Sequence, residues 1–171
     1  YFKDNKIKGH NTDVSGFEYS IKDLNINMSN KKVLIIGAGG VVSSILFALN
    51  KMSLNKIFIT NRTRKKAEDL KKLFKNLIIV EWGDIPDFDM VINATSVGLN
   101  KNDQLELNLS KIKNKFFYDI IYNPPKTNFL KYAEVLGNNI ENGKKMFIYQ
   151  AAAAFKIWHN IQPEINNAVF K

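Results

Sequence analysis

Short apolar runs alternate along this chain with longer stretches in which apolar residues recur every three or four positions. The runs are rich in Val, Ile and Phe, as is typical of strands buried in a parallel sheet, and the longer stretches have the period of amphipathic helices. The runs cover residues 32–36, 56–60, 77–80, 89–93, 116–121 and 139–141. This alternation predicts an α/β fold with a doubly wound parallel sheet of about six strands and flanking helices.

The pattern also divides the chain into three segments. Residues 1–30 hold a short hairpin and a helix, and residues 31–145 hold the strands of the sheet. Residues 146–171 hold a long helix and then a second helix that begins at Pro163, because proline is favoured in a first helical turn. Residues 101–114 are polar and rich in lysine, so we expect them at the surface.

A glycine-rich turn follows the first strand of the sheet. It consists of Gly37, Ala38, Gly39 and Gly40. Glycines let the backbone approach a pyrophosphate closely, and the N–H groups at the start of the next helix attract its charge. A plain strand, turn and helix can carry the same glycines, and the third small position of the fingerprint holds Val42. The turn alone therefore leaves open a Rossmann-like dinucleotide site and an ordinary connection.

Basic residues follow the second strand of the sheet, where an NAD site usually carries Asp or Glu. The segment is Asn61, Arg62, Thr63 and Arg64. A guanidinium matches a phosphate in geometry and charge, and cations at a helix start are unfavourable unless an anion binds there. The segment therefore predicts a ribose 2′-phosphate, and hence NADP as the cofactor.

Composition argues against several other classes of function. The net charge of +9 comes from lysines scattered among asparagines, which argues against a nucleic-acid partner. The chain has no cysteine, which is compatible with a reducing cytoplasmic setting, and its two histidines, His10 and His159, are too far apart in sequence to suggest a metal site. No apolar run approaches the roughly 20 residues that span a bilayer, so we expect no membrane association.

Seven short motifs occur in order along the chain. They are Gly9 to Asp13, the turn at 37–40, Asn61 to Thr63, Asn93 to Gly98, Asp119 with Tyr122, Pro124 and Thr127, Asn142 and Gly143 with Met146, and Gln150 with Ala152 and Phe155. In order and content they resemble the shikimate dehydrogenase family, and the resemblance covers the whole chain. It implies a hydride transfer between NADP(H) and the pair 3-dehydroshikimate and shikimate.

The resemblance also implies roles for individual residues. Asp13, which by itself could simply cap a helix together with Thr12, would be the catalytic carboxylate that the family pairs with a lysine. The small-molecule substrate would contact Asn11, Asp13, Tyr122 and Gln150. Besides the glycine turn and residues 61–64, the cofactor would contact Asn93, Ala94, Thr95, Ser96, Gly143 and Met146.

One departure from the family is large. The family's catalytic lysine and most of its substrate-binding groups lie in an N-terminal substrate domain of about 90 to 100 residues, to which nothing in this chain corresponds. The resemblance therefore predicts a cofactor-binding portion that is inactive alone. We also expect the helices at 14–24 and 146–159 to expose apolar side chains, which would promote self-association. The candidates are Ile21, Phe147, Phe155 and Trp158.

Three alternatives remain at this stage. A close relative that oxidises quinate or another ring acid would carry the same motifs, because substrate choice depends on the missing domain. A nucleotide-binding module without catalysis would use the same fold, although it would not need Asp13 or Gln150. A basic nucleic-acid-binding domain is the third.

Overall fold

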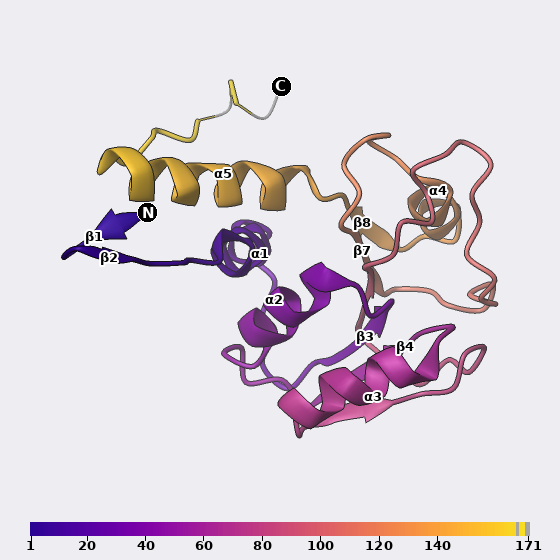
Figure 1. Cartoon of the computed structure of the whole chain (residues 1–171). Helices are drawn as coiled ribbons and strands as arrows, with labels where there is room; N and C mark the ends of the chain where they lie inside the picture. The colour runs from indigo at the N-terminus through magenta and orange to yellow at the C-terminus, as the bar shows by residue number, and fades with distance from the viewer. Residues whose placement is uncertain (167, 170–171) are drawn as a thin grey trace.

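Six short strands form one parallel sheet in the order β5-β4-β3-β6-β7-β8; Figure 1 labels β3, β4, β7 and β8 among them. The computed structural model describes residues 1–166 and 168–169. The strands are β3 (Lys32–Ile36), β4 (Lys56–Thr60), β5 (Leu77–Ile79), β6 (Met90–Asn93), β7 (Phe116–Asp119) and β8 (Asn139–Glu141). The chain leaves β3 in one direction along the sheet and later returns to β6 on its other side, which is the topology of a doubly wound fold. The predicted fold class is confirmed.

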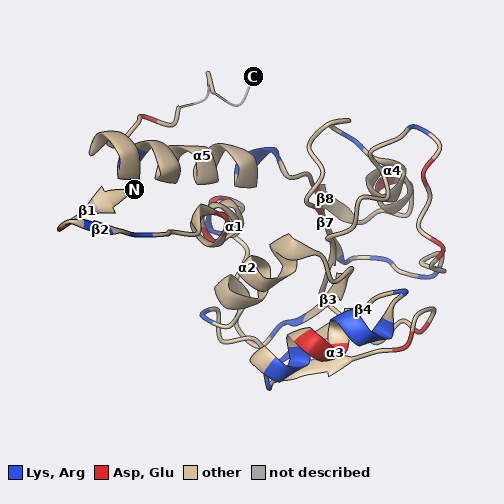
Figure 2. Cartoon of the chain, viewed as in Figure 1, with Lys and Arg blue, Asp and Glu red and all other residues tan. Residues whose placement is uncertain are grey.

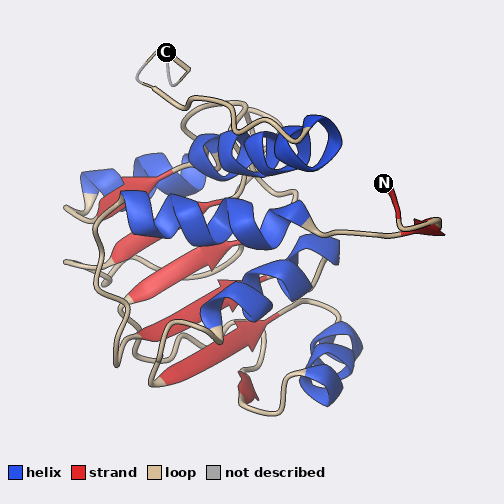
Figure 3. Cartoon of the chain, turned by 90° about the vertical axis from the view of Figure 1, so that its left-hand side faces the viewer, coloured by secondary structure: helices blue, strands red, loops and turns tan. Residues whose placement is uncertain are grey.

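Several helices lie across one face of this sheet, with the strands visible between them (Figure 3). The helices of the chain are α1 (Thr12–Asp23), α2 (Gly40–Leu49), α3 (Arg64–Leu73), α4 (Asn128–Val135) and α5 (Lys144–His159). Apolar side chains of α1, α2 and α3 pack on the sheet in one core cluster, which includes Phe17, Ile45 and Ala67. Short β-branched strands suit this position because they are buried on both faces.

The opposite face is covered by α4 and by an extended crossover. The crossover between β6 and β7 runs through residues 94–115, all of them described, and contains no helix. Leu105, Leu107 and Leu109 pack with α4 against the sheet, and Leu109 is 4% exposed. The expectation that residues 101–114 lie at the surface is therefore wrong for these leucines, whose alternating spacing is that of a half-buried extended chain.

The first 24 residues follow the predicted order of hairpin and helix. Strands β1 (Phe2–Lys3) and β2 (Lys6–Ile7) pair antiparallel and project away from the body of the molecule (Figure 1). The residue that caps α1 is Asn11, whose Oδ1 accepts a hydrogen bond from the Asp13 N–H at 3.0 Å. The prediction that Thr12 or Asp13 caps this helix is wrong, because both already belong to its first turn.

Helices α1 and α5 pack against each other at very short range. A side chain at Gly16 would place its Cβ 2.7 Å from the Met146 carbonyl oxygen and 2.8 Å from the Gln150 Cβ. Glycine at this position therefore sets the distance between the two helices. The second C-terminal helix predicted from Pro163 is not formed, since residues 161–166 have no regular secondary structure, and residues 167, 170 and 171 lie outside the described part of the chain.

Aromatic side chains on the outer face of α5 are exposed. Phe147 is 45% exposed, Phe155 41% and Trp158 69%, as predicted. Ile21 is only 2% exposed, so its prediction as a surface residue is wrong. Ile21 lies on the side of α1 that faces the sheet and belongs to the same core cluster as Phe17.

We predict that Gly16→Ala destabilises the protein. Alanine is the better helix former by about 1 kcal/mol, but its methyl group would collide with the α5 backbone, and overpacking typically costs about 1 to 3 kcal/mol. Thermal and urea unfolding should show a net loss. Gly40→Ala is the matched control, because a Cβ at Gly40 meets nothing within 4 Å. Equal or higher stability of Gly16→Ala would contradict the close packing of α1 on α5.

Candidate functional site

A cavity of about 400 Å³ opens where neighbouring strands of the sheet end. Its walls come from the carboxyl ends of β3, β4, β5 and β6 and from the start of α3, and the β6–β7 crossover closes one side. We call it the strand-end cavity. Ligands of doubly wound folds bind at this edge, beside the point where the strand order reverses.

The glycine turn forms the inner wall of the strand-end cavity. Gly37, Ala38 and Gly39 line it, and Gly37 has a φ of +108°. A Cβ at Gly37 would lie 2.8 Å from the Ala94 carbonyl oxygen, so only glycine lets this turn approach the loop after β6. Gly39 has no side chain to cap α2, and the first turn of α2 therefore offers N–H groups to an anion. Gly40 is the first residue of α2 and does not line the cavity.

Two cationic side chains line the same cavity. They are Arg62, which was predicted, and Lys66, which was not; Asn61 lies beside them. Arg64 instead forms ion pairs with Glu68, at 3.1 Å, and with Glu81, and it does not line the cavity. Figure 2 shows how densely Lys and Arg occupy α3.

A sequence signal for Lys66 did exist. It lies in the first turn of α3, just after the basic segment at which the sequence predicts an anion. Thr63 occupies the N-cap position of α3 but makes no side-chain capping hydrogen bond, and it lies outside the cavity lining.

The side chain of Asn93 holds the loop after β6 in place through hydrogen bonds. Its side chain is fully buried; Nδ2 donates to the Val97 carbonyl and to Asp119 Oδ1, both at 3.1 Å. Its Oδ1 accepts from the Thr95 N–H and from Thr95 Oγ1. The amide is thus fully engaged, and Asn93 does not line the cavity. Ala94, Thr95 and Ser96, which were predicted with it, do.

Asp119 is the partner that fixes Asn93. Its carboxylate is completely buried and accepts hydrogen bonds from Asn93 Nδ2, from the Ile121 N–H at 3.0 Å and from Thr127 Oγ1 at 2.6 Å. Burial raises the pKa of the Asp119 carboxyl from 3.8 to about 6, although all three hydrogen bonds lower it. Because Thr127 also caps α4, the Asp119 carboxylate connects the loop after β6 to the start of α4.

The residues predicted to bind substrate gather around α1 and α5, outside the strand-end cavity. Thr12 Oγ1 donates to Gln150 Oε1 at 3.4 Å, and Asn11 Nδ2 donates to Ser44 Oγ at 2.9 Å. Asp13 lies in the first turn of α1 and forms no ion pair within the part of the chain that the structure describes. Tyr122 is 44% exposed and stacks on Phe147 of α5 with ring centroids 4.6 Å apart.

The two remaining predicted cofactor residues lie at the start of α5. Gly143 and Met146 are both buried there, and the Gly143 N–H donates to the Ile121 carbonyl at 3.1 Å. Neither residue lines the strand-end cavity.

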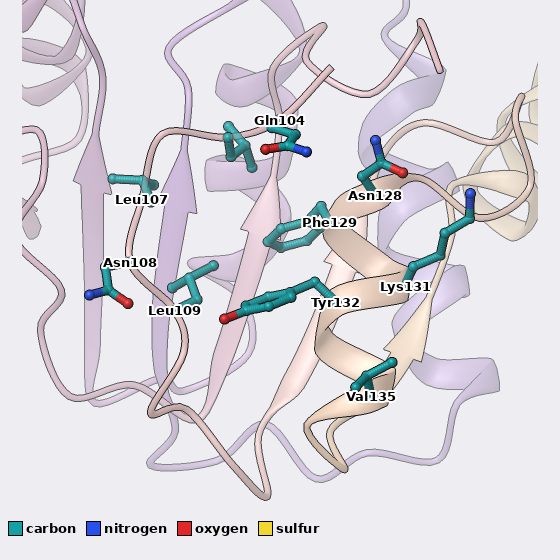
Figure 4. A pocket seen from close by; sticks show the side chains of 10 residues that line it. Gln104, Leu107, Asn108, Leu109, Asn128, Phe129, Lys131, Tyr132 and Val135 are labelled. Atoms are coloured by element: carbon teal, nitrogen blue, oxygen red, sulfur yellow. The ribbon is translucent and has the colours of Figure 1, made fainter. Parts of the chain in front are cut away.

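A second hollow, of about 570 Å³, lies between α4 and the crossover (Figure 4). Leu107, Leu109, Phe129 and Tyr132 line it, and Gln104 belongs to both hollows. Apart from Gln104 and Leu105, its lining shares nothing with the strand-end cavity, and it contains none of the predicted site residues. The strand-end cavity, which combines a glycine turn with cationic side chains, is the candidate site.

The described residues show no sign of two other kinds of site. They contain no group of three or more His, Cys, Asp or Glu side chains placed to hold a metal ion. In addition, none of their helices has both the length and the apolar character that crossing a bilayer requires.

Comparison with known proteins gives consistent matches. The family model described as Shikimate / quinate 5-dehydrogenase matches residues 19–127. A curated relative from Pelagibacter ubique named shikimate dehydrogenase (NADP(+)) is 56% identical over 168 residues, which are 98% of this chain and 63% of that protein.

Solved structures agree with this match. Shikimate 5-dehydrogenase of Thermus thermophilus in complex with NADP(H) and shikimate superposes with a TM-score of 0.83 at 29% identity, covering 95% of this chain and 61% of that one. Quinate dehydrogenase of Corynebacterium glutamicum in complex with NAD gives a TM-score of 0.84 at 28% identity, covering 91% and 59%. The chain thus spans about three fifths of the length of the proteins that it matches.

We predict that Asp119→Asn changes how stability depends on pH. Because the pKa of Asp119 is raised to about 6, the folded state binds more protons than the unfolded state between about pH 4 and 6. The free energy of unfolding of wild type should therefore fall by about 2 to 3 kcal/mol relative to that of the variant as the pH rises through this window. Urea unfolding at a series of pH values measures the difference.

Asp103→Asn is the control of opposite sign for this experiment. Hydrogen bonds from the N–H groups of Gly98 and Asn100 lower the pKa of Asp103. The stability of wild type relative to Asp103→Asn should therefore increase as the pH rises. A constant difference between Asp119→Asn and wild type would show that burial does not penalise the charge on Asp119.

Proposed function

The chain belongs to the shikimate and quinate dehydrogenase family, and from this premise we propose that it is the NADP-binding portion of an NADP-dependent shikimate dehydrogenase. The observation that carries the proposal is the strand-end cavity, in which the glycine turn, Arg62 and Lys66 meet. In this reading, residues 31–145 form the cofactor-binding unit, and residues 1–30 and 146–171 flank it as junction segments. The cysteine-free composition suits the cytoplasmic setting that we propose.

Each part of the cavity suits one part of NADP. The N–H groups at the start of α2 would bind the pyrophosphate, which the glycine turn can approach closely. Arg62 and Lys66 would bind the ribose 2′-phosphate, where an NAD site would carry a carboxylate. The loop Ala94 to Val97 would lie beside the nicotinamide half, because it follows β6 on the far side of the reversal in strand order.

The cofactor supplies the hydride, so the protein has to orient the substrate and to move one proton. In the reduction of 3-dehydroshikimate, the ring carbonyl gains the hydride at carbon and a proton at oxygen. Asp13 forms no ion pair among the described residues. We propose that it orients a lysine ammonium that delivers this proton. Gln150, held next to α1 through Thr12, would donate a hydrogen bond to the substrate.

A further proposal concerns the part of the relatives that this chain does not cover. This chain matches about 60% of their length, and we propose that the lysine and the groups that hold the substrate lie in the remainder. The chain alone would then bind NADP but would hold shikimate poorly, and its turnover would be low or absent. The exposed rings of Phe147, Phe155 and Trp158 would be covered by that remainder or, in its absence, would promote self-association.

A quinate dehydrogenase is the second candidate function. The structural match to the quinate dehydrogenase of Corynebacterium glutamicum, which was solved with NAD, favours it. The cationic lining of the strand-end cavity favours the NADP enzyme instead. Turnover of shikimate and quinate by a protein that joins this chain to the proposed substrate-binding part would distinguish the two substrates. The relative affinity for NADP and NAD would distinguish the two kinds of cofactor site.

We predict that Arg62→Ala and Lys66→Ala each weaken NADP much more than NAD. Loss of one charged hydrogen bond to the 2′-phosphate should cost about 1.5 to 3 kcal/mol of NADP binding free energy. Isothermal titration of the 171-residue chain measures both cofactors. Arg64→Ala is the matched control, since Arg64 is engaged by Glu68 and Glu81 and should leave both affinities unchanged. Equal weakening of NAD and NADP by Arg62→Ala would remove the basis for the NADP assignment.

A further inference from the structure

Four neighbouring strand ends present a row of different chemical groups. In the order β5, β4, β3 and β6, the segments that follow the strands contribute Trp82, Arg62, the turn at Gly37 to Gly39 and the loop Ala94 to Val97. All of them line the strand-end cavity. Adjacent strands lie about 4.8 Å apart, so the row extends over about 14 Å.

The order of this row matches the order of groups along NADP. The turn at Gly37 to Gly39 suits the pyrophosphate, Arg62 suits the adenosine 2′-phosphate on one side of it, and the loop at 94–97 takes the nicotinamide half on the other. The adenine is then the group that lies beyond Arg62, at the end of β5. The aromatic side chain that the cavity offers there is Trp82.

Trp82 is placed to serve as a rigid stacking surface. It is half-buried, it packs against the core cluster on the α4 side of the sheet, and it also lines the cavity. An indole anchored in this way gives up little freedom when a base stacks on it, and stacking of a base on an aromatic ring is a strong and well-defined contact.

We propose that Trp82 binds the adenine ring of the cofactor by stacking. The inference rests on the proposed NADP function and adds a residue that the glycine and arginine motifs do not reveal. The chain has two tryptophans, Trp82 and Trp158, and Trp158 lies 69% exposed on α5. Their fluorescence can therefore be separated by single substitutions.

The test is a titration of the 171-residue chain with adenosine 2′,5′-bisphosphate, which lacks the nicotinamide half. In Trp158→Phe, where Trp82 is the one remaining indole, emission should be quenched as the probe binds. In Trp82→Phe, where Trp158 remains, emission should not change. Calorimetry should show that Trp82→Leu raises the dissociation constant about tenfold, whereas Trp82→Phe, which keeps a ring, changes it about threefold or less.

The outcomes distinguish this inference from the proposed function. If the probe binds Trp158→Phe without quenching, or if Trp82→Leu binds as tightly as wild type, Trp82 is not the adenine surface, while NADP binding stands. If wild type does not bind the probe at all, both proposals fail. The Trp158→Phe titration leaves Trp82 in place, so the test does not depend on whether Trp82→Leu folds.

Discussion

The buried hydrogen bond between Asn93 and Asp119 is the interaction on which the geometry of the site depends. It joins the carboxyl ends of β6 and β7. From Asn93 the network continues through Thr95 to the loop that lines the cavity, and from Asp119 it continues through Thr127 to the start of α4. A buried carboxylate is costly unless several donors satisfy it, and here three donors do. The buried Asp119 carboxylate therefore stands where the loop after β6, which has no regular secondary structure, is held in one conformation.

A second constraint acts through glycine. Gly37 lets the turn after β3 approach the loop after β6, and Gly16 lets α5 approach α1. The first contact shapes the wall of the strand-end cavity, and the second brings Gln150 within reach of Thr12, next to Asp13. These two close approaches, which leave no room for a side chain, thus position the residues proposed to bind the cofactor and those proposed to bind the substrate. The strand-end cavity and the α1–α5 pair are held by the same sheet, because α1 packs on it through Phe17 and Ile21.

Sequence reasoning recovered the features that depend on periodicity. The strands, their parallel arrangement and the glycine turn follow from apolar runs and from residues whose backbone preferences are strong. Arg62 was found because it breaks an expectation, namely a carboxylate after β4. The assignment to the family came from the seven motifs together, since each alone is short.

The lining of the strand-end cavity differs from the predicted residues where packing decides the direction of a side chain. Arg64 was expected beside Arg62 but turns to Glu68 and Glu81, while Lys66 takes the place in the cavity. Asn93 stays a predicted cofactor residue, and its amide is hydrogen-bonded within the loop after β6. Trp82 belongs to no pattern, because its position follows from the neighbourhood of β5 and β4 in the folded sheet.

We propose above all that this chain carries the cofactor half of a dehydrogenase whose catalytic lysine and substrate groups lie outside it. The most direct test follows the reduction of NADP by shikimate with the purified 171-residue chain, with the full-length relative from Pelagibacter ubique as the positive control. We expect turnover by the relative and little or none by the chain, although the chain binds NADP in a parallel titration. Robust turnover by the chain alone would contradict the proposed function.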